Sequence, residues 1–290
     1  MKKLCVLLSF MALPCLLLAQ QTERHLWGLV TVDSLQQATY GTWFKKNYAD
    51  YKPTPSVIND LKALKVNDFK IKIFFGTWCG DTKREMPRLI KVLDEIGFPK
   101  ERITFIALSQ ADSTYKQSSK SEERGYHIFR VGCYVIEKNG VEINRITEFP
   151  VLSMERDLLA IFSNQNYTPQ YPAYLTITKW LADGTLADEN ISGQSLAPQL
   201  RQKISSVSDL NACGYVLLSA GKMKEAVKVF RINAALFPEN GNVWHSLAEG
   251  WFKLGDKEKA LIALENGLQL NKDAAFSKSF LTLQKQILEK

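Results

Sequence analysis

The chain has 290 residues, 46% of them hydrophobic and 23% charged, which is ordinary for a globular protein and leaves room for two domains. Its formal net charge is +7, and the basic residues are spread along the chain without an Arg/Lys run. This pattern indicates a solvated surface and argues against a nucleic-acid-binding protein.

Residues 1–19 predict a secretory signal peptide. The sequence MKKLCVLLSFMALPCLLLA has a basic start, an apolar core and a small-residue end. The apolar run is short for a membrane span, and Pro14 interrupts it. We expect cleavage near Ala19, a periplasmic or secreted mature chain, and no integral membrane span. A lipid anchor at Cys15 is the alternative, disfavoured because Pro14 stands where such sites need a small residue.

Residues 20–66 are expected to form an N-terminal extension that packs on the core. Apolar residues recur at helical spacing over residues 34–48. Thr54 followed by Pro55 is a suitable cap and first-turn pair for a short helix that runs to Leu64.

Residues 73–87, IFFGTWCGDTKREMP, carry the chemistry. They predict an apolar strand that runs into a turn at Trp78 and Cys79 and then opens a helix. A cysteine at a helix N-terminus faces unpaired backbone N–H groups and the positive end of the helix dipole. Both favour the thiolate, which is the nucleophile in thiol-disulfide exchange. Trp78 can shield one side of the sulfur, and Gly80 lets the backbone turn tightly.

Residues 67–164 resemble the thioredoxin superfamily. Pro87 stands eight residues after Cys79, and a strand is expected at 103–108. Two more strands are expected at 131–137 and 141–146, joined by an Asn139-Gly140 turn, and a helix is expected from near Ser153. The segments FGTWCGDTKREMP and RITEFPVLSMERDLL are similar to secreted thioredoxin-like proteins of Bacteroidetes-type bacteria. The resemblance implies an α/β thioredoxin-like fold, a central mixed sheet flanked by helices, that acts on protein thiols or disulfides.

Three parts of that redox apparatus differ here. Thr82 stands where dithiol thioredoxins have their second cysteine, and Gly132 stands where they have a cis-proline facing the active cysteine. Ile73 replaces the buried acid that many of them carry. Without a resolving neighbour, a mixed disulfide at Cys79 must be released by an external thiol.

Two residues near Cys79 have competing interpretations. Thr82 either hydrogen-bonds the thiolate or is a first-turn helix residue without a role, and the sequence leaves both open. Cys133 is a candidate second thiol that would resolve Cys79 if the two Cα atoms lie within about 7 Å. We favour the alternative that Cys133 is a small buried core residue. Trp78, Cys79 and Thr82 are therefore the candidate catalytic residues.

The mature chain retains three cysteines, Cys79, Cys133 and Cys213. An odd number predicts at least one free thiol and argues against a disulfide scaffold. Cys213 is expected to pack in a helical core. Neither the cysteines nor the three histidines have the spacing of zinc ligands, so we expect no metal. We also expect no cofactor, because a side-chain sulfur can carry the chemistry.

The polar segment 112–124 predicts either a solvated helix or a loop. Residues 165–207 predict a linker with one or two short helices, because QNYTPQYP at its start is rich in Asn and Pro.

Residues 208–290 contain an internal repeat with a period of about 34 residues. Residues of similar kind recur at this spacing: Gly221 and Gly255, Ala226 and Ala260, Phe230 and Leu264, Leu236 and Leu270. The period matches the tetratricopeptide repeat, and residues 276–288 predict a further helix that completes an all-α module. Each repeat must bury a face on its neighbour, and two repeats are few. We therefore predict that this module contacts the segment 173–207 or the thioredoxin-like domain.

Two functions follow from these observations. One is a secreted or periplasmic protein that exchanges thiols and disulfides through the single Cys79. The other is a non-catalytic scaffold of the cell envelope whose repeat groove holds a peptide or protein. Replacement of Cys79 by Ser would abolish the first function and leave the second intact.

Overall fold

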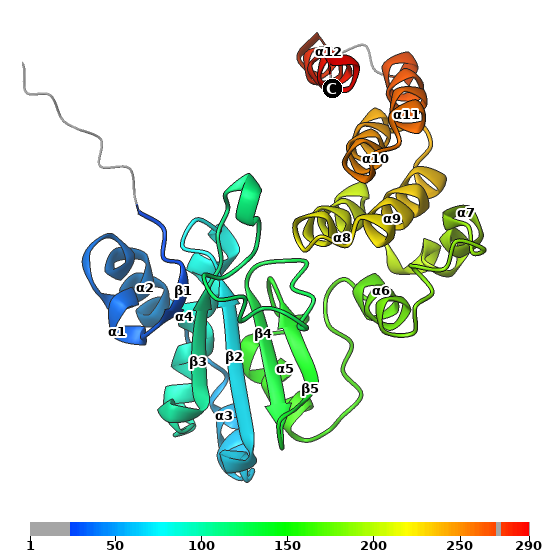
Figure 1. Ribbon diagram of the computed structural model, residues 1–290. Helices are drawn as coiled ribbons and strands as arrows, with labels where there is room; N and C mark the ends of the chain where they lie inside the picture. Colours follow the sequence, from blue (N-terminus) through cyan, green and yellow to red (C-terminus); the bar gives the residue numbers. More distant parts are fainter. Residues whose placement is uncertain (1–23, 271–273, 290) are drawn as a thin grey trace, which may run out of the picture.

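The computed structural model of the chain describes residues 24–270 and 274–289. The expected signal peptide, its cleavage near Ala19 and the alternative anchor at Cys15 lie outside these residues. Figure 1 shows a sheet with helices packed against it, followed along the chain by a stack of helices. None of the described helices is both long and apolar enough to cross a membrane.

The sheet has five strands in the order β1-β3-β2-β4-β5. Their bounds are Gly28–Val30 for β1, Phe69–Phe75 for β2, Ile103–Ala107 for β3, Cys133–Lys138 for β4 and Val141–Thr147 for β5. The central strand β2 pairs parallel with β3 and antiparallel with β4, so the sheet is mixed, as predicted. The last three residues of β2 are fully buried, because both faces of the sheet are covered there.

Helices cover one face of the sheet. Their bounds are Val32–Gln36 for α1, Ala38–Asp50 for α2, Pro55–Lys62 for α3, Gly80–Glu95 for α4 and Met154–Phe162 for α5. Ile73 and Phe75 of β2 pack on this face with Met86 and Leu89 of α4. Phe74 points to the opposite face, because side chains alternate along a strand, and packs there with residues that include Ile106 and Cys133.

The N-terminal extension folds differently from its prediction in two places. The helix expected over residues 34–48 is divided, since Gln37 is extended (φ −98°, ψ 159°) and separates α1 from α2. The hydroxyl of Thr54, expected to cap α3, donates instead to Glu155 Oε1 of α5 at 3.0 Å. Long-range packing has overridden both local patterns.

In the described residues of the C-terminal part there are seven α-helices. Their bounds are Ala173–Ala182 for α6, Gly193–Leu196 for α7, Val207–Ser219 for α8, Met223–Leu236 for α9, Gly241–Leu254 for α10, Lys257–Leu270 for α11 and Ala274–Glu289 for α12. The starts of α8 and α10 are separated by the same interval as the starts of α9 and α11. This interval equals the period of the sequence repeat, which thus corresponds to two successive helix pairs.

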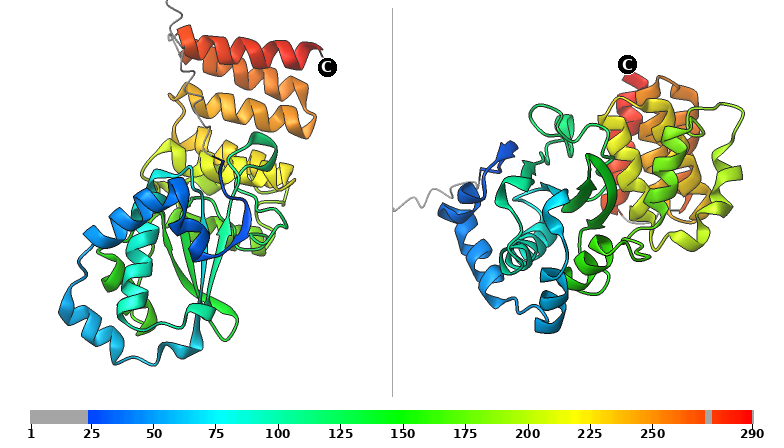
Figure 2. Two further views of the ribbon diagram at one scale, coloured as in Figure 1. Left: turned by 90° about the vertical axis from the view of Figure 1, so that its left-hand side faces the viewer. Right: turned by 90° about the horizontal axis from the view of Figure 1, so that it is seen from below.

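The helical part shares its core with the rest of the molecule. One cluster of buried side chains joins Tyr174 of α6 and Leu210 of α8 with Phe129 from the loop before β4. From the loop after β3, Gln117 Nε2 also donates to the Ser219 carbonyl at the end of α8 at 2.6 Å. In both views of Figure 2 the helical stack lies beside the α/β part. The predicted contact is therefore confirmed, with both the linker segment and the α/β part.

Candidate functional site

Cys79 lies where the central strand meets a long helix. The chain leaves β2 at Phe75, turns through Gly76, Thr77 and Trp78, and enters α4 at Gly80. Cys79 is the N-cap residue in an extended conformation (φ −87°, ψ 126°). This is the strand, turn and helix predicted for residues 73–87. Cys79 therefore stands at the unpaired N–H groups of the first helical turn, although its sulfur makes no capping hydrogen bond to them.

The half-buried Cys79 sulfur donates a hydrogen bond to the Val131 carbonyl oxygen at 2.9 Å. The Val131–Gly132 peptide bond is cis, and Gly132 is the residue that the sequence aligns with a cis-proline. A thiol donates this hydrogen bond only while it holds its proton, whereas a thiolate at the same place would face the positive end of the α4 dipole.

Trp78 is fixed beside the cysteine by a hydrogen bond and by a close contact. Its indole Nε1 donates to the Leu108 carbonyl, just past the end of β3, at 2.9 Å. Its ring lies against Gly76, where an added Cβ would stand 2.4 Å from the ring atom Cε2. Gly76 is therefore required for this placement of Trp78. Both Trp78 and Cys79 pack against the side chains on the sheet face opposite α4.

Thr82 is fully buried in the first turn of α4. Its Oγ1 accepts from the Gly76 N–H at 3.5 Å, which ties the helix to the turn. The Cys79 sulfur has the Val131 carbonyl as its acceptor. In this structure Thr82 thus supports the turn that carries Cys79.

Tyr134 of β4 was missed by the sequence reading. Its ring is fully buried, and its hydroxyl would lie 2.8 Å from a Cβ added at Gly132. Within the described residues this hydroxyl has no hydrogen-bond partner. Burial raises the pKa of Tyr134 well above its ordinary range, so the hydroxyl stays protonated. Nothing in the sequence of this apolar strand indicates that the Tyr134 hydroxyl lies beside Gly132.

Thr77 was also missed, and it joins the N-terminal extension to the turn. Its buried Oγ1 accepts from the Leu26 N–H at 3.2 Å and lies 3.1 Å from His25 Nδ1. The next residue, Trp27, donates from Nε1 to the Gln117 carbonyl at 3.0 Å. The extension therefore reaches the candidate site as well as the core.

Cys133 lies at the start of β4 and is 2% exposed. It packs with Phe74 and Val135, and Arg145 Nη1 lies 3.9 Å from its sulfur. Burial raises the pKa of the Cys133 thiol. Cys79, Cys133 and Cys213 are all free thiols. Cys133 occupies the place of a small core residue, although it shares its cluster with the side chain of Cys79.

The segment 112–124, predicted as a solvated helix or a loop, is a loop with one short 3₁₀ turn at Asp112–Thr114. It is less solvated than its composition indicates, since Lys116 and Ser118 are buried. Lys116 has a positive φ of 55°, and its Nζ donates to the Phe129 carbonyl. Burial and the nearby Arg130 guanidinium lower the pKa of Lys116 to about 8.

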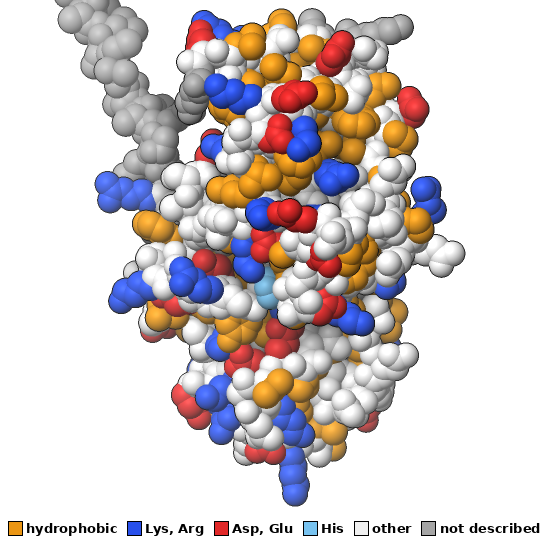
Figure 3. Space-filling view, turned by 45° about the vertical axis from the view of Figure 1, so that its right-hand side comes forward, with side chains coloured by type: hydrophobic (Ala, Val, Ile, Leu, Met, Phe, Trp, Pro, Cys, Tyr) orange, Lys and Arg blue, Asp and Glu red, His pale blue; other side chains and the backbone are white. Residues whose placement is uncertain are grey.

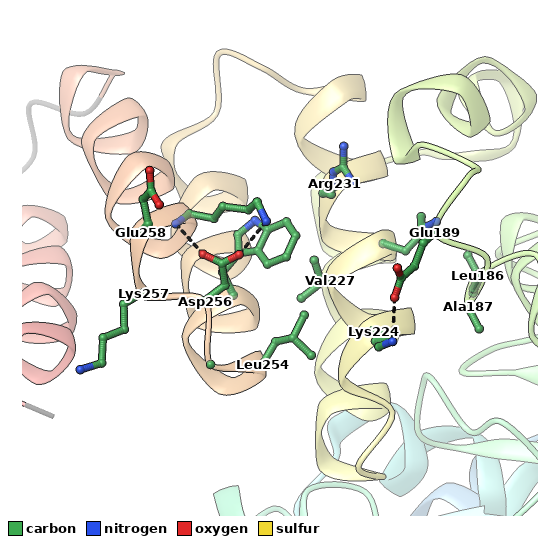
Figure 4. Close-up of a pocket in the computed structure, with 14 residues that line it drawn as sticks. Leu186, Ala187, Glu189, Lys224, Val227, Arg231, Leu254, Asp256, Lys257 and Glu258 are labelled. Atoms are coloured by element: carbon green, nitrogen blue, oxygen red, sulfur yellow. Dashed lines mark hydrogen bonds and ion pairs between the residues drawn. The ribbon is translucent and has the colours of Figure 1, made fainter.

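The helical part holds a separate pocket of about 760 Å³. Figure 4 shows it between α9, the α10–α11 turn and the loop that follows α6. Trp251 lines it, with Lys259 Nζ 4.7 Å from the centre of the indole. Five basic and three acidic residues line the pocket: Lys224, Lys228, Arg231, Lys257, Lys259, Glu189, Asp256 and Glu258. The pocket therefore combines an aromatic wall with an excess of positive charge.

On the face that Figure 3 presents, basic side chains are interspersed with acidic ones. In residues 24–270 and 274–289, no group of three or more His, Cys, Asp or Glu residues is placed to hold a metal ion.

No protein-family model matches the chain, and no curated protein sequence is significantly similar to it. Functional inference therefore rests on the residues and their geometry.

Proposed function

We propose that the protein is a secreted or periplasmic thioredoxin-like protein that exchanges thiols and disulfides through the single nucleophile Cys79. The observation that carries this proposal is the position of the Cys79 sulfur. It lies at the N-terminus of the 16-residue helix α4, at the end of the central strand, and against the Val131 carbonyl. This arrangement offers a half-buried sulfur to a partner and supplies helix N–H groups that stabilise a thiolate.

The element order supports the thioredoxin-like part of the proposal. A parallel β2–β3 pair is followed by the antiparallel hairpin β4–β5 and by helix α5, and Pro87 lies inside the helix that Cys79 begins. The two helix pairs, which begin one sequence period apart, support tetratricopeptide-type repeats in the C-terminal part.

The chemistry proceeds in two exchange steps. The Cys79 thiolate attacks one sulfur of a partner disulfide, a new S–S bond forms, and the second partner sulfur leaves as a thiolate. An external thiolate then attacks the partner sulfur of this mixed disulfide and releases Cys79 as a thiolate. The partner disulfide has exchanged one thiol for another with no net oxidation. Trp78 limits the approach to one side of the sulfur, and Thr82 supports the turn that carries it.

Site-resolved glutathionylation tests the proposal. The full chain is incubated with glutathione disulfide, and the adduct on each cysteine is located by mass spectrometry. We expect one adduct at Cys79, its removal by added thiol, and its loss in Cys79→Ser. Cys133→Ser is the matched control and should form the adduct normally. Absence of an adduct at Cys79, or exchange that persists in Cys79→Ser, would contradict the proposal.

A second candidate function is the capture of an acidic peptide segment by the helical part. The pocket beside Trp251 favours it. Of its five basic residues, Lys224 and Lys259 are paired with Glu189 and Asp256, and Lys228 donates to the Asp188 and Ile191 carbonyls. Among the described residues, Arg231 and Lys257 have no acidic partner within ion-pair distance. These two cations can meet carboxylates of a bound segment.

Peptide selection on the immobilised full chain tests this second function. Selected peptides should be acidic, should bind Cys79→Ser as well as the parent chain, and should lose affinity for Arg231→Glu. Substitution of Lys46, an exposed residue of α2 far along the chain, is the control and should leave binding unchanged. Selected peptides that ignore the Arg231 substitution would rule out this pocket.

A further inference from the structure

A four-residue segment, Phe129–Gly132, connects the Cys79 sulfur with the helical part. The Val131 carbonyl accepts the Cys79 hydrogen bond at 2.9 Å. The Phe129 ring is buried in the core of the helical part and meets the Tyr174 ring edge-on, with ring centres 5.2 Å apart. At the other end of the segment, the Gly132 carbonyl accepts from the Glu148 N–H at 2.6 Å.

The side chain of Arg130 fastens this segment to two helices. Its Nε donates to the Tyr174 hydroxyl of α6 at 2.9 Å. Its Nη2 donates to Ser208 Oγ of α8 at 2.8 Å and lies 3.4 Å from Asp209 Oδ1. The remaining nitrogen, Nη1, lies 3.5 Å from Glu148 Oε1. A planar guanidinium can satisfy several directed partners at once, which a lysine ammonium cannot do with the same geometry.

The segment is also held from the loop after β3. The buried Lys116 Nζ donates to the Phe129 carbonyl, and the neighbouring Gln117 bonds the end of α8. The carbonyls of Phe129, Val131 and Gly132 thus each accept a hydrogen bond. The Val131 carbonyl has little freedom to move away from the sulfur while the helical part is docked.

We propose that Arg130 is a positioning residue for Cys79: it fastens Phe129–Gly132 to α6 and α8 and so holds the Val131 carbonyl on the sulfur. Docking of the helical part thereby maintains the hydrogen bond of the Cys79 sulfur to this carbonyl and restrains its reactivity. This inference rests on the proposed function of Cys79 and adds to it a mechanism of control. A thiolate cannot donate to the carbonyl, so release of the segment removes an interaction that only the neutral thiol makes.

The first variant is Arg130→Lys, which keeps the positive charge beside the segment and removes the fork of donors. The rate at which iodoacetamide alkylates Cys79 in the folded full chain is measured by mass spectrometry at pH 7 and at pH 10. A hydrogen bond of ordinary net strength corresponds to about a fivefold change in an equilibrium. We expect Cys79 to react about fivefold faster in the variant at pH 7, where the thiolate is the reacting form. At pH 10 the ratio should fall toward one.

The double variant Tyr174→Phe/Ser208→Ala removes the partners of Arg130 from the helical side and leaves its charge in place. It should accelerate Cys79 alkylation in the same direction, and it decides the question if Arg130→Lys does not fold. Arg88→Lys is the matched control, since Arg88 lies on α4 and bonds Glu85 instead of the segment. Its Cys79 rate should equal that of the parent chain.

The other two cysteines show whether a variant changes only the position of the segment or partly unfolds the protein. Cys213 is fully buried in the helical core, and Cys133 is 2% exposed in the sheet. Both should stay unreactive in the variants. An unchanged Cys79 rate, a ratio that is equal at pH 7 and pH 10, or joint exposure of all three cysteines would overturn the positioning role.

The same measurements distinguish the positioning role of Arg130 from the proposed thiol-disulfide exchange at Cys79, on which it rests. Accelerated alkylation in the Arg130 variants without any glutathione exchange at Cys79 would refute the proposed function alone. Normal exchange with an unchanged alkylation rate would refute the positioning role alone.

Discussion

Replacement of the buried Lys116 by Met should change how the stability of the protein depends on pH. The lysine is 6% exposed, and its pKa is lowered from 10.5 to about 8, first by burial and then by the positive charge of Arg130. The folded chain therefore disfavours the ammonium form. A change of this size corresponds to about 3 kcal/mol of lost stability at pH 7, where the amine is charged in both states.

The sign follows from proton binding. Between pH 8 and 10.5 the unfolded chain holds a proton on Lys116 that the folded chain has released. Stability therefore rises with pH across this window, by at most about 1.4 kcal/mol per pH unit from this group. Lys116→Met removes the dependence. Relative to the variant, the parent chain should gain about 3 kcal/mol between pH 7 and 10.5.

Urea unfolding followed by tryptophan fluorescence at pH 7, 8, 9 and 10 measures this difference. Other titrating groups act in both proteins and cancel in the comparison. Lys46→Met, at an exposed position of α2, is the control and should run parallel to the parent chain at every pH. Stability curves of Lys116→Met and the parent that stay parallel from pH 7 to 10 would refute the lowered pKa of Lys116.

Two further substitutions test the packing and the N-terminal contact. Gly214→Val should destabilise the protein by at least about 2 kcal/mol, because a Cβ there would stand 2.2 Å from a ring atom of Phe230. Gly80→Ala, with no atom within 4 Å of the added Cβ, should keep its urea midpoint within a small shift, and equal midpoints for both variants would contradict the packing. Thr77→Val should release the Leu26 amide, whose acceptor is the Thr77 hydroxyl, and speed its hydrogen exchange. Thr77→Ser keeps the hydroxyl and should keep the protection, so fast exchange in Thr77→Ser would show that the methyl group matters instead.

Several elements could be predicted because their cause is local. The hairpin turn at Asn139 and Gly140 has φ values of 54° and 79°, a conformation that these two residue types tolerate well. The helix α5 begins directly after Ser153, whose hydroxyl accepts from the Arg156 N–H. In each case the residue type selects a backbone conformation within a few positions.

Other elements could not be predicted from the sequence, because contacts with residues distant along the chain create them. The three-residue strand β1 has no alternating pattern and exists because Gly28–Val30 pairs with the strand β3. The break at Gln37 divides a segment whose apolar spacing reads as one helix. A short strand and a helix break are decided by what they pack against, and neither leaves a periodic signal.

The sequence alone determined the strand-turn-helix that carries Cys79 and the repeated helix pairs. The periodicity of strands and helices and the residue types of turns depend on residues that are close together in the chain. Only the tertiary structure decided what surrounds the sulfur. Lys116 lies in a polar loop and Arg130 in the loop before β4, and a local pattern would assign both charges to solvent. Lys116 is buried, and Arg130 is partly buried where it bonds helices α6 and α8, which are distant along the chain. Burial of a charged side chain depends on the residues that surround it in space, and the local amino-acid sequence does not identify them.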